Sequence, residues 1–202
     1  MGYTKGLLAR QAELGRPVRV GVVGAGQMGS GLVASIQKAP GMAVAAVADI
    51  VLDKATSALH NAGRDDVVVA DTDLGAAAEA IAKGKSTVIS DGLKMPELPV
   101  DIVVEVSGVP EIAAQIAYTC ITHAKDVALM TVEADITVGP LLSQMANAGN
   151  SVYTVMRGDE PVECLKLVEY AEDLGLTVVC AGKGKNNVNI PHSVPEDNEA
   201  EA

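Results

Sequence analysis

The chain has 202 residues, a length that suits one large domain or one domain with part of a second. Hydrophobic residues make up 49% of the chain, which predicts a packed core and excludes global disorder. The net charge of −11 argues against a nucleic-acid partner, because phosphate contacts need a basic surface.

Strand-like and helix-like segments alternate along the chain, after an N-terminal leader helix predicted within residues 1–17. The strand-like runs are continuously apolar rather than alternating, which is typical of strands covered on both faces. Strands are predicted at 18–23, 43–48, 67–70, 86–90, 101–106, 126–130, 151–155 and 176–181. Helices are predicted at 27–38, 53–62, 73–83, 110–123, 138–148 and 161–174.

Residues that favour helix ends agree with this alternation. Gly149 and Gly175 directly follow two predicted helices, where glycine adopts a left-handed conformation without strain. Pro110 and Pro161 stand where helices begin, because the first helical position needs no N–H donor. Residues 91–99 are predicted to form a loop.

This pattern predicts an α/β fold, a doubly wound Rossmann-type domain with a parallel sheet. We assign 18–181 to an NAD(P)-binding Rossmann domain and 182–202 to the start of a substrate region or an acidic tail. Dinucleotide-dependent enzymes usually carry a separate substrate domain, for which this length leaves no room. We therefore expect a partial chain from which the substrate domain is missing.

A glycine-rich turn follows the first strand and opens the first helix of that domain. It has the form G-x-G-x-x-G and comprises Gly24, Gly26, Gln27, Met28 and Gly29, with one further residue. Such a turn between a strand and a helix is typical of dinucleotide binding. The first glycine permits the tight turn, the second admits the pyrophosphate, and the third allows the helix to pack closely on the strand. The helix N-terminus offers free N–H groups to the phosphates.

Asp49 ends the second strand, twenty positions after Gly29. An acid at this place binds the hydroxyls of the adenosine ribose and repels a 2′-phosphate, so Asp49 favours NAD over NADP. The alternative interpretation is an ordinary strand-to-helix turn with a capping acid.

Ser107 and Gly108 follow the strand predicted at 101–106. Ligands of open α/β sheets bind outside the carboxyl ends of the strands, so these two residues are candidates for contact with the nicotinamide ribose. An ordinary junction that leads into the helix at Pro110 explains the same residues equally well.

Two further segments carry charged candidates. Glu133 and Asp135 follow the next strand and can present carboxylates to a substrate or to water, although solvated loop acids are commoner. Lys183 and Lys185 lie between glycines after the last predicted strand. A lysine there can polarise a substrate carbonyl, or donate a proton if burial lowers its pKa. The alternative is a flexible turn with exposed lysines.

No metal site is predicted, because the three cysteines and three histidines show no ligand spacing. Cys120, Cys164 and Cys180 lie in apolar runs, so we expect reduced, buried thiols in a cytoplasmic protein. No apolar run is long enough to span a membrane, and the first 15 residues lack an apolar signal core.

The segments VRVGVVGAGQMGSGLV, VADI, EVSGVPE, TVEADITVGPLL, GDEP and AGKGKNN together resemble a known family. They are similar to the homoserine-dehydrogenase-like oxidoreductases with a C-terminal SAF domain, a group that includes the 1-deoxy-D-xylulose 5-phosphate reductoisomerase-like enzymes. The resemblance covers roughly residues 8–187. It implies NAD(P)-dependent chemistry on a small polyol, sugar phosphate or hydroxy acid, in some members coupled to isomerisation. It also implies a longer parent protein. The reductoisomerase-like members use NADPH, so the choice between NAD and NADP stays open.

The leading hypothesis is therefore an NAD(P)-dependent oxidoreductase with a small-molecule substrate, and a homo-oligomer in its full-length form. Glu133, Lys183 and Lys185 are the catalytic candidates. Two alternatives remain: homoserine dehydrogenase itself, and a dinucleotide-binding module without catalysis.

Overall fold

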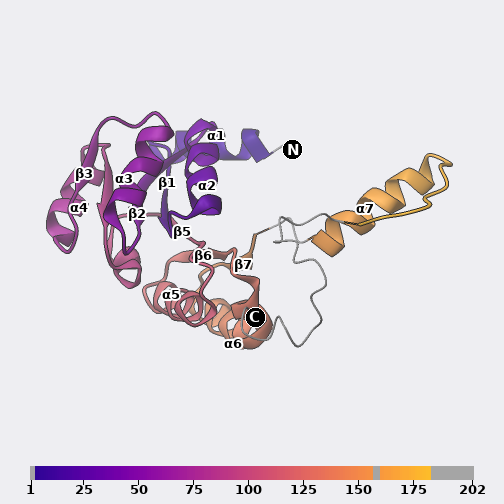
Figure 1. The fold of residues 1–202 in the computed structure, drawn as a ribbon. Coiled ribbons are helices and arrows are strands. Elements are labelled where there is room, and N and C mark those ends of the chain that lie inside the picture. The colour runs from indigo at the N-terminus through magenta and orange to yellow at the C-terminus, as the bar shows by residue number, and fades with distance from the viewer. Residues whose placement is uncertain (1–2, 157–159, 183–202) are drawn as a thin grey trace, which may run out of the picture. The chain divides into compact units, whose positions relative to one another are not determined.

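The computed structural model describes residues 3–156 and 160–182 (Figure 1). The chain divides into two units, Met1–Met156 and Arg157–Ala202. Within the described residues the first unit contains one parallel sheet of seven strands, in the order β3-β4-β2-β1-β5-β6-β7. The strands are β1 (Val18–Val23), β2 (Met42–Ala48), β3 (Val67–Val69), β4 (Ser86–Ile89), β5 (Ile102–Glu105), β6 (Asp126–Leu129) and β7 (Tyr153–Val155).

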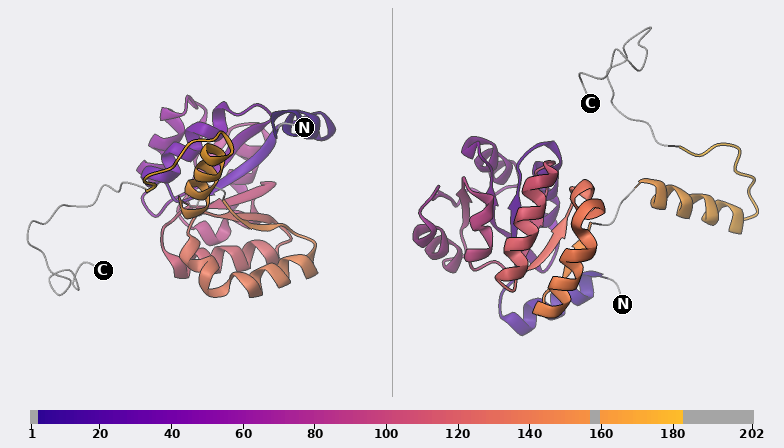
Figure 2. Two further views of the ribbon diagram at one scale, coloured as in Figure 1. Left: turned by 90° about the vertical axis from the view of Figure 1, so that its right-hand side faces the viewer. Right: turned by 90° about the horizontal axis from the view of Figure 1, so that it is seen from below.

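Helices cover both faces of this sheet (Figure 2). The first unit's helices are α1 (Tyr3–Leu14), α2 (Gln27–Lys38), α3 (Leu52–Asn61), α4 (Leu74–Ala82), the 3-10 helix η1 (Gly92–Glu97), α5 (Pro110–Thr122) and α6 (Val132–Gly149). Apolar side chains of α2 and α3 pack on one face, and those of α4, η1, α5 and α6 pack on the other. Figure 2 shows α5 and α6 running side by side.

The core is aliphatic, as the composition predicts. On one face Val33 and Ile36 of α2 and Leu59 of α3 are buried against the valines of β1 and β2. These positions recur at helical spacing, so each helix buries one stripe. Many of the helix residues against the sheet are alanines, which bring the helix axes close to the strands.

The predicted doubly wound α/β fold is confirmed. β2 lies on one side of β1 and β5 lies on the other, so the direction of winding reverses between β1 and β5. In an open α/β sheet this reversal leaves a crevice at the carboxyl ends of the two strands.

Three local expectations differ from the structure. Helix α6 begins at Val132 rather than at residue 138, because Ala134 packs into the core and extends the helix towards β6. The left-handed residue at its end is Asn150 (φ 55°) rather than Gly149, which still belongs to the helix. Within the predicted loop, Asp91 caps η1 by accepting a hydrogen bond from the Leu93 N–H.

The second unit contains helix α7 (Glu160–Asp173), which ends with Gly175 in a left-handed conformation (φ 78°), as predicted. The strand predicted at 176–181 is wrong, since these residues have no regular structure. Leu176 is 60% exposed and Val179 is 94% exposed. A strand requires a hydrogen-bonding neighbour, and the described residues offer none to this segment. The domain boundaries proposed from the sequence, 1–17, 18–181 and 182–202, stay predictions.

In the part of the chain that the structure describes, no helix is long and apolar enough to cross a membrane. The described residues also hold no cluster of metal-ligating side chains. The cysteines are unpaired, but their burial differs from the expectation. Cys120 is buried, and burial raises the pKa of its thiol to about 12. Cys164 is half-buried and Cys180 is exposed, because neither lies in the core of the first unit.

Candidate cofactor-binding site

Two adjoining cavities lie along the carboxyl ends of β1, β2, β5 and β6. The first has a volume of about 420 Å³ and the second about 440 Å³, both in the range of small-molecule sites. Gly26, Val106 and Ser107 line both cavities. The cavities are therefore two parts of one cleft at the place where the strand order reverses.

The glycine turn is shaped by close backbone approaches. Gly24 has a φ of 105°, and a Cβ there would lie 2.6 Å from the carbonyl oxygen of Val106. A Cβ on Gly29 would overlap the carbonyl of Gly24, so this position too requires glycine. At Gly26 a Cβ would meet no protein atom within 4 Å. Gly24 and Gly29 thus serve packing, whereas Gly26 keeps the space above the turn open.

The N-terminus of α2 points its backbone donors at this open space. Gly26 is the N-cap and provides no side-chain cap, so the first-turn N–H groups of Gln27 and Met28 have no intrahelical partner. The first turn carries no acid, so no side chain of that turn neutralises the positive end of the helix dipole. Such an end binds anions.

The side chain of Asp49 links the glycine turn to the start of α3 through two hydrogen bonds. Its Oδ2 accepts a hydrogen bond from the Ala25 N–H at 2.8 Å, and its Oδ1 accepts one from the Val51 N–H, also at 2.8 Å. Asp49 also lines the first cavity. Because a carboxylate has about four acceptor positions, both oxygens retain capacity for ribose hydroxyls.

The rim of the first cavity contains residues that the sequence analysis did not select. Ile50 is 91% exposed and lines the cavity together with Leu93, Val109 and Ile112. Lys54, in the first half of α3, lines it as well and forms no ion pair within the described residues. This rim combines an exposed apolar surface with one cation.

The second cavity extends over β5 and β6. It is lined by Gln27, Met28, Ser107, Gly108, Met130, Thr131 and Glu133, in addition to the shared Gly26 and Val106. The hydroxyl of Thr131 is buried and accepts a hydrogen bond from the Gly108 N–H at 3.1 Å. Glu133 is exposed in the first turn of α6, where its carboxylate faces solvent and the cavity.

Asp135 does not join Glu133 in this cavity. Its Oδ1 accepts a hydrogen bond from the hydroxyl of Tyr153 at 2.7 Å, which ties α6 to β7. Burial, together with this hydrogen bond, raises the pKa of Tyr153. Asp135 therefore has a structural role in the described part of the chain.

The cofactor candidates named from the sequence line one cleft, except Gly29, which is buried against the carbonyl of Gly24. Glu133 lies at the second cavity. Lys183 and Lys185 lie outside the described residues, so their proposed roles stay predictions. The glycine motif and the strand ends predicted the two turns, but Lys54 and Leu93 belong to no motif, and Thr131 was not singled out within the segment TVEADITVGPLL. Thr131 carries one usable signal, because it lies two residues after the end of β6 at the same sheet edge.

A model of the family described as oxidoreductase DRL, catalytic domain, matches residues 158–202. This segment is under a quarter of the chain, and much of it lies outside the described residues. No curated protein matches the chain.

Solved structures share the fold of the first unit. Myo-inositol dehydrogenase from Lactobacillus casei, solved with NAD(H) and myo-inositol, matches with a TM-score of 0.55 and 18% identity, over 77% of this chain and 42% of its own. The WlbA dehydrogenase from Bordetella pertussis, solved with NADH and UDP-GlcNAcA, matches with a TM-score of 0.57 and 15% identity, over 79% and 43%.

An oxidoreductase from Agrobacterium radiobacter, solved with NAD+, L-tartaric acid and magnesium, matches with a TM-score of 0.56 and 10% identity, over 76% of this chain and 40% of its own. At these identities the likeness establishes the fold. The chain spans about two fifths of the length of these structures.

Proposed function

We propose that the chain binds a nicotinamide dinucleotide in the cleft and forms the cofactor half of an NAD(P)-dependent oxidoreductase. One observation supports this proposal. The Gly24–Gly29 turn, Asp49 and Ser107 lie together at one cleft, where the strand order reverses. Folds of this kind bind dinucleotides at that point. The solved relatives described above contain NAD(H) or NAD+.

Each part of the cofactor has a counterpart in the cleft. The adenosine ribose would bind at Asp49, with the adenine against the apolar rim formed by Ile50, Val109 and Ile112. The pyrophosphate would lie on the N-terminus of α2, above Gly26. The nicotinamide nucleoside would then extend into the second cavity beside Ser107. Asp49 favours NAD, whereas the cation of Lys54 would tolerate the 2′-phosphate of NADP.

The substrate is proposed to be a small polyol, sugar phosphate or hydroxy acid. The named ligands of the solved relatives include myo-inositol and L-tartaric acid, which have this character. Glu133 would face the substrate, and Lys183 or Lys185 would polarise its carbonyl or relay a proton. Hydride transfer is the chemistry that the bound cofactor supplies. A homo-oligomer and a homoserine-dehydrogenase-like parent with a SAF domain belong to the same proposal.

Titration of the chain with NADH and with NADPH, followed by fluorescence of the reduced nicotinamide, tests cofactor binding. We expect saturable binding, tighter for NADH than for NADPH because of the carboxylate of Asp49. If neither nucleotide binds, the proposal is wrong. Replacement of Lys183 and Lys185 by alanine should leave both affinities unchanged, since these lysines are assigned to the substrate.

A second candidate is a dinucleotide-binding module without catalysis. It is favoured by one observation: all the residues that line the two cavities belong to Met1–Met156. Tight NADH binding without turnover of polyols, sugar phosphates, hydroxy acids or homoserine would support this candidate. Turnover of homoserine alone would instead identify a homoserine dehydrogenase.

A further inference from the structure

A fully buried carboxylate precedes the turn at Ser107, which lines both cavities. Glu105 is the last residue of β5 and has no exposed surface. Its Oε1 accepts hydrogen bonds from both the N–H and the hydroxyl of Ser107, each at 2.6 Å. Its Oε2 is buried and has no hydrogen-bond partner in the described part of the chain.

The fold alone does not account for an acid at this position. Burial of a carboxylate costs several kcal/mol unless an opposite charge and hydrogen bonds compensate it. Within the described residues no cation pairs with Glu105, and half of its acceptor capacity is unused. The two preceding residues on β5 are Val103 and Val104, which fill their places without polar atoms. Unsatisfied buried groups of this kind are retained mainly where they serve a site.

Glu105 determines what Ser107 can offer to a ligand. The only hydroxyl proton of Ser107 is donated to Glu105, and the hydroxyl oxygen accepts a bond from the Val109 N–H at 3.2 Å. One lone pair therefore remains on the hydroxyl oxygen. In the same turn the Gly108 N–H is already donated to Thr131. Ser107 thus faces the cleft as an acceptor without a free donor.

We propose that Glu105 is a positioning residue that holds Ser107 as a hydrogen-bond acceptor for the nicotinamide nucleoside, through a ribose hydroxyl or a carboxamide N–H. This inference rests on the proposed function. Ser107 lines both cavities, and Gly108 lines only the second, to which Asp49 does not contribute. The adenosine half of the cofactor lies at Asp49 and does not depend on this hydrogen bond.

The test compares NADH with ADP, which lacks both the nicotinamide and its ribose, on the full chain. In the Glu105→Met variant, which removes the acceptor at similar size, NADH affinity should fall by about tenfold, the effect of one misdirected hydrogen bond. The affinity for ADP should stay within about twofold of the original. Glu105→Gln, whose amide oxygen can still accept from Ser107, should restore most of the NADH affinity.

A double-mutant cycle with Ser107→Ala tests whether Glu105 acts through Ser107. The double variant should lose no more NADH affinity than Glu105→Met alone, because the two residues form one unit. Additive losses, equal losses for NADH and ADP, or a Gln variant as weak as the Met variant would each overturn the proposal. If Glu105→Met does not fold, Ser107→Ala alone must show the selective loss of NADH affinity.

Asp101→Asn provides a matched control, since Asp101 directly precedes the opposite end of β5. It should leave the affinities for both ligands unchanged. Failure of the unaltered chain to bind either ligand would contradict the proposed function itself. Normal binding by the unaltered chain with unchanged NADH affinity in Glu105→Met would contradict only the role of Glu105.

Discussion

Single residues determine the geometry of the glycine turn. Two glycines of α2 differ in whether their surroundings leave space for a side chain. Gly29 is buried, and a Cβ there would overlap the carbonyl of Gly24. Gly31 lies two positions further along the same helix, is exposed, and has no atom within 4 Å of its Cβ position. The two positions form a matched pair in one helix.

We predict that Gly29→Ala destabilises the chain by about 2 kcal/mol, because the backbone of the turn must move. Gly31→Ala should instead stabilise it by up to about 1 kcal/mol, the gain of alanine over glycine in a helix. Urea unfolding of both variants measures the difference. An equal effect of the two substitutions would show that the contact between Gly29 and Gly24 does not limit the turn.

Among single residues, the sequence predicted the glycine turn and Asp49. It did not predict the residues that other segments bring to the cleft. Gly24, Gly26 and Asp49 were identifiable because their spacing within one strand–helix–strand unit carries the signal. Lys54, Leu93 and Thr131 come from three different segments, and only the order of the strands brings them to one edge. Glu105 lies within the apolar run that predicts a strand at 101–106. Its burial and its unpaired oxygen could therefore be recognised only in the structure.

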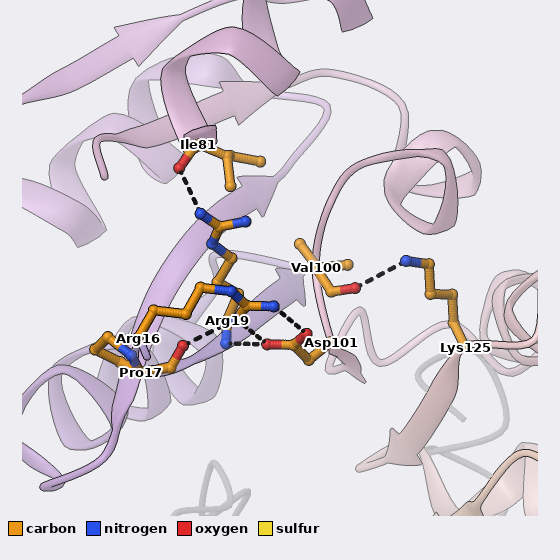
Figure 3. Close-up of polar contacts among 7 residues, drawn as sticks. All are labelled: Arg16, Pro17, Arg19, Ile81, Val100, Asp101 and Lys125. Carbon is orange, nitrogen blue, oxygen red and sulfur yellow. Dashed lines mark hydrogen bonds and ion pairs between the residues drawn. The ribbon is translucent and has the colours of Figure 1, made fainter. Parts of the chain in front are cut away.

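Among the elements, β1 and β5 are joined at their amino ends by an ion pair far from the cleft. Arg16 donates two hydrogen bonds to Asp101, at 2.6 Å and 2.8 Å, and the Arg19 N–H donates a third to the same carboxylate at 2.7 Å (Figure 3). Burial alone would raise the pKa of Asp101, but these donors and their charges outweigh it and hold the pKa of Asp101 below its ordinary value.

A depressed pKa in the folded state means that ionised Asp101 stabilises the fold above its ordinary pKa, and that this contribution is lost as the pH falls through the folded value. We predict that Asp101→Asn lowers the free energy of unfolding by about 1 kcal/mol at pH 7, discounted for partial exposure. The deficit should persist to about pH 5 and shrink below about pH 4. Denaturant unfolding across this range provides the measurement, and a deficit independent of pH would exclude the ionic contribution.

The start of α6 is a helix boundary that the helix propensities of its residues do not predict. Val132, Ile136, Thr137 and Val138 are β-branched, and Pro140 lies inside the helix, so the sequence favoured a later start. Tertiary contacts override this preference. Ala134 is buried against the sheet, and the bond between Asp135 and Tyr153 holds the first turn in place.

For the whole molecule, the alternation of strands and helices was sufficient to predict the fold class, because a parallel sheet buried on both faces leaves continuous apolar runs. The same signal predicted a strand at 176–181, where apolar residues have no neighbouring strand among the described residues. A run of apolar residues indicates that a segment can form a buried strand. It does not indicate whether a neighbouring strand is present to pair with it.

The division of the chain predicts that residues 1–156 form a self-sufficient unit. The N–H of Met156 donates a hydrogen bond to the carbonyl of Leu129, and its side chain packs on the core. The contacts of the last strand therefore extend to Met156. We expect a chain that ends at Met156 to retain the melting temperature of the first unit and its affinity for NADH. Calorimetry and the NADH titration test this, and loss of cooperative melting would show that the second unit is needed for folding.

The position of β1 between β2 and β5 has a consequence for the order of assembly during synthesis. Arg19 and Asp101 are 82 residues apart in the chain, yet they meet at the start of adjacent strands. One edge of β1 therefore stays unpaired until the ribosome has released β5 and the turn beyond it. Such non-local pairing slows folding and leaves an unpaired strand edge exposed in the nascent chain. The cleft is thus completed only after β5 and the turn beyond it have been synthesised.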